Sequence, residues 1–130
     1  PYNSQAMRTS SHTILLAQLL VPGLVVADNV LQLQERRLNL AAGGIEQPCF
    51  TMQAEQRLEY SFESSAPVDL NLHYREDGDI EFPVTLEAVT GEDGVYISPK
   101  NRDYCLMWTN RSADPVSLEY SYQLLQPGPE

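Results

Sequence analysis

Hydrophobic and polar residues alternate along most of the chain after residue 56. Four segments show this period of two: residues 57–63, 67–76, 79–88 and 116–125. Strict alternation is typical of antiparallel strands that bury one face and leave the other in solvent. The residues expected to face the core are Leu58, Tyr60, Phe62, Val68, Leu70, Leu72, Tyr74, Ile80, Phe82, Val84, Leu86, Val116, Leu118, Tyr120, Tyr122 and Leu124.

Turn-forming residues separate these segments. Gly and Asp cluster at residues 76–79 and 90–94, and both clusters predict hairpin turns. Residues 64–67, 98–103 and 110–115 are rich in Ser, Pro, Asn and Asp, and they are expected to form loops.

An earlier alternating run at residues 30–40 predicts another strand, which the sequence AAGG at residues 41–44 ends. Pro83 has no N–H to donate to a neighbouring strand, so its segment is expected at a sheet edge or at a bulge. No segment after residue 40 shows a helical period. Short strands between regularly spaced turns predict an all-β fold, an antiparallel β-sandwich of about seven to eight strands.

The segment YCLMWT at residues 104–109 is apolar on both sides. One side carries Tyr104, Leu106 and Trp108, and the other side carries Cys105, Met107 and Thr109. This pattern predicts a central strand covered on both faces. Trp and Met are commonly core residues, so Tyr104, Leu106 and Trp108 are predicted to be structural rather than functional.

The composition indicates a single globular domain with an acidic surface. The chain has 130 residues, of which 42% are hydrophobic, and a formal net charge of −10. An acidic surface repels phosphates, so nucleic acid and anionic membranes are not expected partners. The acidic residues are scattered, as on a solvated surface.

The beginning of the chain predicts an exported protein. Residues 7–27 combine a basic start, an apolar stretch at 14–26 and small residues before an expected cleavage after Ala27, as in a secretory signal peptide. Residues 1–6 precede the expected start, and residues 28–130 would form the mature domain without a stable membrane span. The expected location is periplasmic or extracellular, and a retained N-terminal anchor is the alternative.

Cys49 and Cys105 are the two cysteines of the chain. An even pair in an exported protein predicts a disulfide, between neighbouring strands or across the core. The alternative is a reactive thiol, which would need a nearby base such as His73, the one histidine of the mature domain.

The chain resembles the GOLD domain of the emp24/gp25L/p24 family of transport proteins over roughly residues 30–124. The resemblance is based on the CF pair at Cys49, the strand PVDLNLHYRE, the turn before YCLMWTN and the last alternating strand. It implies a β-sandwich, a disulfide between Cys49 and Cys105, and a protein or lipid partner. The family continues into a coiled coil, a membrane helix and a sorting tail. The sequence shows none of these after its last strand, so we expect a stand-alone, bacterial relative without cargo-receptor function.

Two kinds of metal site are conceivable from the residue types. His73, Met52 and Met107, with cysteine, are ligands that suit copper or another soft metal, although the clustered loop of copper proteins is absent. The acidic turn residues Asp77, Asp79, Glu92 and Asp93 offer oxygen ligands for calcium, but without EF-hand spacing. The simpler interpretation is that His73 and these acids lie on solvated faces, and no metal or cofactor is predicted.

The sequence also lacks a catalytic signature. No phosphate loop and no nucleophile elbow is present, and alternation places most acids on exposed faces. We therefore expect no catalytic residues and a non-enzymatic module that binds a protein or lipid partner, with a periplasmic soft-metal protein as the alternative. Asn110-Arg111-Ser112 matches the N-glycosylation motif, which a eukaryotic secretory route would use.

Overall fold

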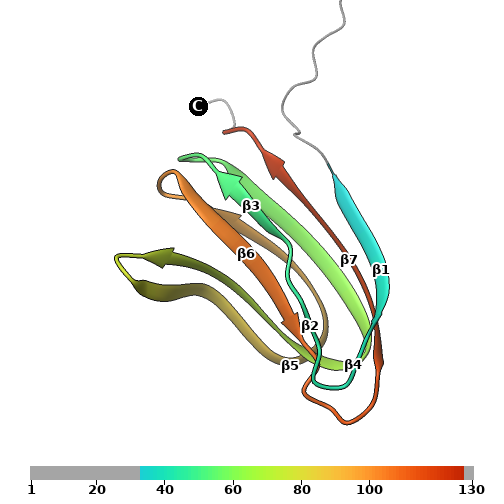
Figure 1. The fold of residues 1–130 in the computed structure, drawn as a ribbon. Helices are drawn as coiled ribbons and strands as arrows, with labels where there is room; N and C mark the ends of the chain where they lie inside the picture. Colours follow the sequence, from blue (N-terminus) through green and yellow to red (C-terminus); the bar gives the residue numbers. More distant parts are fainter. Residues whose placement is uncertain (1–32, 128–130) are drawn as a thin grey trace, which may run out of the picture.

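A computed structural model describes residues 33–127, and within this range the fold is entirely β. All strand pairs are antiparallel, which confirms the predicted fold class. The strands are β1 (Gln34–Leu40), β2 (Ile45–Glu46), β3 (Cys49–Met52), β4 (Arg57–Glu76), β5 (Asp79–Ile97), β6 (Arg102–Thr109) and β7 (Val116–Leu125) (Figure 1). The predicted signal segment lies outside the described residues. No helix within residues 33–127 could span a membrane.

The long hairpin of β4 and β5 bends and takes part in both layers of a sandwich (Figure 1). The first half of β4, residues 57–64, pairs with β7, whose other neighbour is β1. The second half, residues 69–73, pairs with β6, which also pairs with β2 and β3. β5 follows the other edge of β4 along both halves, so that one layer is β1-β7-β4-β5 and the second is β5-β4-β6 with β2 and β3.

Two predicted connections are part of these long strands, so those predictions were wrong. Residues 64–67 lie inside β4, where the register with β5 shifts between Glu63 and Val68. Residues 90–94 lie inside β5, and Gly94 is opposite Tyr60. Local turn propensity is overridden here because pairing with β4 continues through both segments.

The turn at the tip of the hairpin is confirmed. Asp77 and Gly78 both have positive φ, 54° and 85°, as a two-residue turn between right-twisted strands requires. Pro83 lies on a strand that pairs only with β4 among the described strands, which confirms its predicted edge position. A second irregularity follows at Ala88, whose N–H donates to Asp69 Oδ1 at 2.9 Å.

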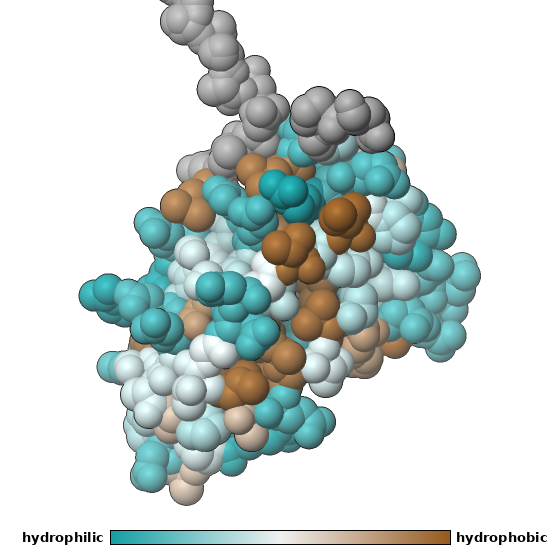
Figure 2. Space-filling model, turned by 180° about the vertical axis from the view of Figure 1, so that it is seen from behind, coloured by the Kyte–Doolittle hydropathy of each residue, from teal (hydrophilic) through white to brown (hydrophobic). Residues whose placement is uncertain are grey.

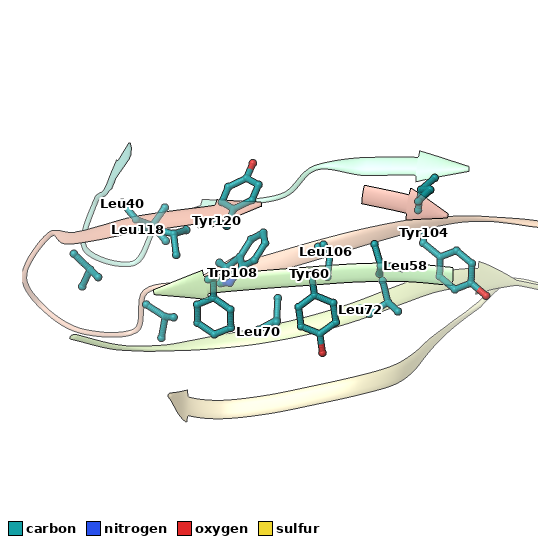
Figure 3. Close-up of a cluster of buried hydrophobic side chains, with 14 of the residues drawn as sticks. Leu40, Leu58, Tyr60, Leu70, Leu72, Tyr104, Leu106, Trp108, Leu118 and Tyr120 are labelled. Carbon is teal, nitrogen blue, oxygen red and sulfur yellow. The ribbon is translucent and has the colours of Figure 1, made fainter. Parts of the chain in front are cut away.

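The core lies between the two layers (Figure 3). Trp108 is fully buried, stacks on Tyr120 with ring centroids 4.3 Å apart, and meets the edge of Phe62. The buried set also includes Leu40 and Met52, and it confirms most predicted core positions: Leu58, Tyr60, Phe62, Val68, Leu70, Leu72, Tyr104, Leu106, Trp108, Val116, Leu118, Tyr120 and Leu124. These contacts join strands of different layers, so the core holds the sandwich together.

The predicted core positions on β5 were wrong in part. Ile80 and Phe82 are 41% and 53% exposed, while Val84 and Leu86 are half-buried. The reason is that the register with β4 shifts between Leu72 and Tyr74, so that Ile80 and Phe82 face the outer side of the sheet, whereas Val84 lies opposite the buried Leu72. Likewise, the segment 104–109 is buried on one face only, because Cys105 and its outer-face neighbours remain half-buried.

Side chains close the sandwich on the side away from β5. Tyr120 donates a 2.6 Å hydrogen bond to Glu46, and Arg36 lies 3.2 Å from the same carboxylate. Phe50 packs on Tyr122 with ring centroids 5.1 Å apart. These contacts join β2 and β3 to β1 and β7, so the arrangement is nearly that of a barrel.

Candidate binding surfaces

A groove of about 690 Å³ lies on the outer face of the second layer. The strand register explains which residues line it. His73 on β4 is directly opposite Cys105 on β6, and Cys105 is directly opposite Cys49 on β3. Met107 lies two residues further along β6 on the same face, and Ile80 and Phe82 of β5 complete the apolar lining.

The predicted disulfide between Cys49 and Cys105 is confirmed. It joins β3 to β6, so the bridge connects neighbouring strands rather than crossing the core. Cys49 is exposed and Cys105 half-buried, so the sulfur atoms lie on the outer face of the sheet.

His73 is held in place within this groove. Its Nδ1 lies 2.7 Å from Asn71 Oδ1, and its ring lies against Phe82 with ring centroids 5.8 Å apart. Burial of the ring, together with the charge of Arg75, lowers the pKa of His73. The neutral imidazole is therefore the dominant form at neutral pH.

A cluster of paired charges forms one end of the groove. The Arg102 guanidinium lies 3.9 Å above the Tyr74 ring and donates a 2.8 Å hydrogen bond to Glu76. Lys100 Nζ lies 3.4 Å from the same carboxylate. The hydrogen bond from Arg102, supported by both positive charges, lowers the pKa of Glu76. The two cations therefore share one carboxylate.

The structure brings together only part of the soft-metal set. His73 and Met107 line one groove, but Met52 is fully buried in the core. The acids of the predicted turns are also separated, because Asp77 and Asp79 flank the hairpin tip while Glu92 and Asp93 lie further along β5, opposite Phe62 and Ser61. Among residues 33–127, no group of three His, Cys, Asp or Glu is placed to hold a metal ion as it stands.

β5 carries an unusual share of the exposed apolar surface. Six large hydrophobic side chains are exposed among the described residues, and four of them, Ile80, Phe82, Val95 and Ile97, belong to β5. On the side of the molecule that faces away from the viewer in Figure 1, apolar side chains form a broken row among polar ones (Figure 2). Alternation alone could not reveal this exposure, although Pro83 indicated an edge.

β5 is also strongly acidic. It contains five acidic residues and no basic residue: Asp79, Glu81, Glu87, Glu92 and Asp93. Within the described part of the chain, none of the five takes part in an ion pair. The strand thus combines unpaired backbone, apolar side chains and uncompensated negative charge.

Asn110, the first residue of the glycosylation motif, has a structural role in the folded domain. Asn110 is fully buried, and its Nδ2 donates hydrogen bonds to the carbonyl oxygens of Leu40, Ala41 and Asp114, at 2.8 to 3.1 Å. Its Oδ1 accepts hydrogen bonds from the N–H and Oγ of Ser112. The nitrogen that would carry a glycan is therefore inaccessible.

These features define an all-β, disulfide-bonded sandwich in which β5 is an exposed edge strand. No family model matches the chain, and no curated protein sequence matches it. Among solved structures, the chain is similar to the Yersinia pseudotuberculosis-derived mitogen, with 10% identity and a TM-score of 0.49. The match covers 76% of this chain and 89% of the mitogen chain.

Proposed function

We propose that this protein is an exported, non-catalytic β-sandwich module that binds a protein partner through β5. The observation that supports the proposal most is the concentration of exposed apolar side chains on a strand that pairs on one edge only. Isolated exposed hydrophobic residues are ordinary, but pairs of them on an edge strand, such as Val95 with Ile97, favour an interaction site. The disulfide is in keeping with an oxidising compartment.

The mode of binding that fits β5 best is strand addition. From Gly91 to Ile97 the register with β4 is regular, without a bulge and without proline. The first half of β5 is different, since Pro83 and the irregularity at Ala88 interrupt it. An extended segment added along residues 91–97 would form backbone hydrogen bonds and place alternate side chains beside Val95.

The negative charge of β5 favours a partner with basic side chains. Five acidic groups without ion pairs favour an extended segment that carries Lys or Arg. A protein segment fits this edge better than a lipid, because a lipid offers no row of backbone donors and acceptors. The resemblance to GOLD domains is part of the same proposal, since it implies a binding role without catalysis.

The proposal is tested with a short synthetic peptide in which Lys and Val alternate. We expect it to perturb and protect the backbone amides of residues 91–97 in NMR spectra of the full chain. The same peptide with Glu in place of Lys, or with N-methylated backbone nitrogens on one edge, should not bind. Val95→Lys should abolish binding, because it places a positive charge at the centre of the edge.

Ile45→Lys is the matched control, because Ile45 is an equally exposed apolar residue on β2 at the opposite edge of the second layer. It should leave peptide binding unchanged. The binding-module proposal itself is tested separately, by placing a photo-crosslinking residue at Val95, Phe82 or Ile45 in cells that export the chain. Adducts of one size from the β5 positions alone, suppressed by excess unlabelled protein, support it. Equal adducts from all three positions, or none, contradict it.

A further inference from the structure

The groove on the second layer contains a row of metal-binding residue types that the sequence keeps far apart. His73 is opposite Cys105, and Cys105 is opposite Cys49 on its other side, so the three residues form a row across adjacent strands. Met107 lies on the same face of β6 and lines the same groove. Side chains directly opposite on adjacent antiparallel strands have Cβ atoms about 5 Å apart. One cation with bonds of about 2.0 to 2.3 Å can therefore bridge neighbouring positions of the row.

The imidazole of His73 has the tautomer of a metal ligand. The carboxamide oxygen of Asn71 can only accept a hydrogen bond, so Nδ1 of His73 carries the proton. The lone pair of the neutral ring is then on Nε2, which makes no hydrogen bond within the described part of the protein. Metal-bound histidines commonly have this arrangement, with one ring nitrogen donating to an oxygen and the other on the metal.

In the present state the disulfide leaves Cys49 and Cys105 without a thiolate. The two sulfur atoms are bonded to each other, and thiolates rather than disulfide sulfurs are the metal ligands. A dithiol reductant would transfer two electrons and two protons to the bridge. The S–S bond would break into two thiols, and the reductant would close to its own disulfide. Metal binding would then release one proton from each thiol to solvent.

We propose that Cys49, Cys105 and His73 form a soft-metal site, selective for Cu(I), that a dithiol opens by reducing the disulfide. The oxidised form of that dithiol closes the site by the reverse exchange, in which it takes up the two electrons and two protons. Met107 supplies a thioether as the fourth ligand. Thiolate, thioether and imidazole ligands together select soft cations such as Cu(I) over Mg²⁺ or Ca²⁺. Two thiolates with one Cu(I) carry a net negative charge, so the nearby cations Arg75, Arg102 and Lys100 do not oppose binding. This site is separate from the β5 edge and does not depend on the proposed function.

The test measures Cu(I) binding to the full chain, with and without prior reduction. The protein is reduced with dithiothreitol, freed of reductant without oxygen, and titrated against a chromophoric Cu(I) chelator. We expect the reduced protein to remove one Cu(I) per chain from the chelator and the oxidised protein to remove none. His73→Gln should weaken the affinity of the reduced protein at least tenfold, and Met107→Leu should also weaken it.

The chain provides its own matched controls. His12→Gln and Met7→Leu change the same residue types in the predicted signal segment, and they should leave the affinity unchanged. The emission of Trp108, the single tryptophan, reports whether the reduced protein keeps its core. An unfolded dithiol would bind Cu(I) without regard to His73, so binding that survives His73→Gln overturns the proposal. Absence of binding after reduction overturns it as well.

Discussion

Replacement of Asn110 by alanine tests the structural role of a residue whose sequence motif suggested glycosylation. The Nδ2 atom donates to Leu40, Ala41 and Asp114, and thereby connects the end of β1 with the loop between β6 and β7. The alanine variant leaves three carbonyl oxygens without this donor at a site where Asn110 itself is fully buried. It also removes the two hydrogen bonds that Oδ1 accepts from Ser112. At about 1 kcal/mol for each of the two N–H donors and the two accepted bonds, we expect a loss of about 4 kcal/mol in unfolding free energy.

This loss is large for a domain whose total stability is of the order of 5–15 kcal/mol. Urea denaturation followed by Trp108 emission measures it, because the single tryptophan of the chain is buried against Tyr120 and Phe62. Asn39→Ala is the matched control. Asn39 is an exposed residue of β1, and its replacement should change stability by no more than about 0.5 kcal/mol.

A second variant separates the donated bonds from the accepted ones. Asn110→Asp keeps the oxygen that accepts from Ser112 but removes the donors and places a carboxylate against carbonyl oxygens. We expect a loss at neutral pH at least as large as that of Asn110→Ala, and a partial recovery when the carboxyl is protonated. The reasoning is refuted if Asn110→Ala costs less than about 1 kcal/mol beyond Asn39→Ala.

Three further predictions concern stability. Replacing Cys49 and Cys105 together by alanine should lower the unfolding free energy in urea by about 4 kcal/mol, the chain-entropy value for a separation of 56 residues. Because the pKa of His73 is lowered in the folded state, the unfolded chain binds more protons near pH 6. The contribution of neutral His73 to the unfolding free energy is therefore complete above the unfolded pKa and is lost as the pH falls through the folded pKa. His73→Gln should remove that part of the pH dependence of urea unfolding. Gly94→Ala should cost about 1–3 kcal/mol, because the new methyl group would overlap the Tyr60 ring, and the cost should shrink when Tyr60 is replaced by leucine in a double-mutant cycle.

The period of two was sufficient to predict most strands and the inner face of the sandwich. It was insufficient where one pattern has two possible meanings. Ile80 and Phe82 alternate with acidic residues as core positions do, but a register shift between β4 and β5 places them on the outer face of the sheet. Gly91 and Gly94 have the composition of a turn, yet pairing with β4 continues through them. Such choices depend on which strands are adjacent, and local sequence does not contain that information.

The same limitation explains why the groove could not be assembled from the sequence. The soft-metal candidates included Met52, which the register places in the core, and the pairing of His73 with Cys105 depends on a β4–β6 register across 32 residues of chain. The structure also indicates why reduction need not destroy this arrangement. The disulfide lies on the outer face, and the core contacts of Trp108 do not involve it. Its loss therefore lowers stability mainly by raising the conformational entropy of the unfolded chain. A reduced domain that keeps its strand register would therefore retain both thiols beside His73, which is the condition that the proposed metal site requires.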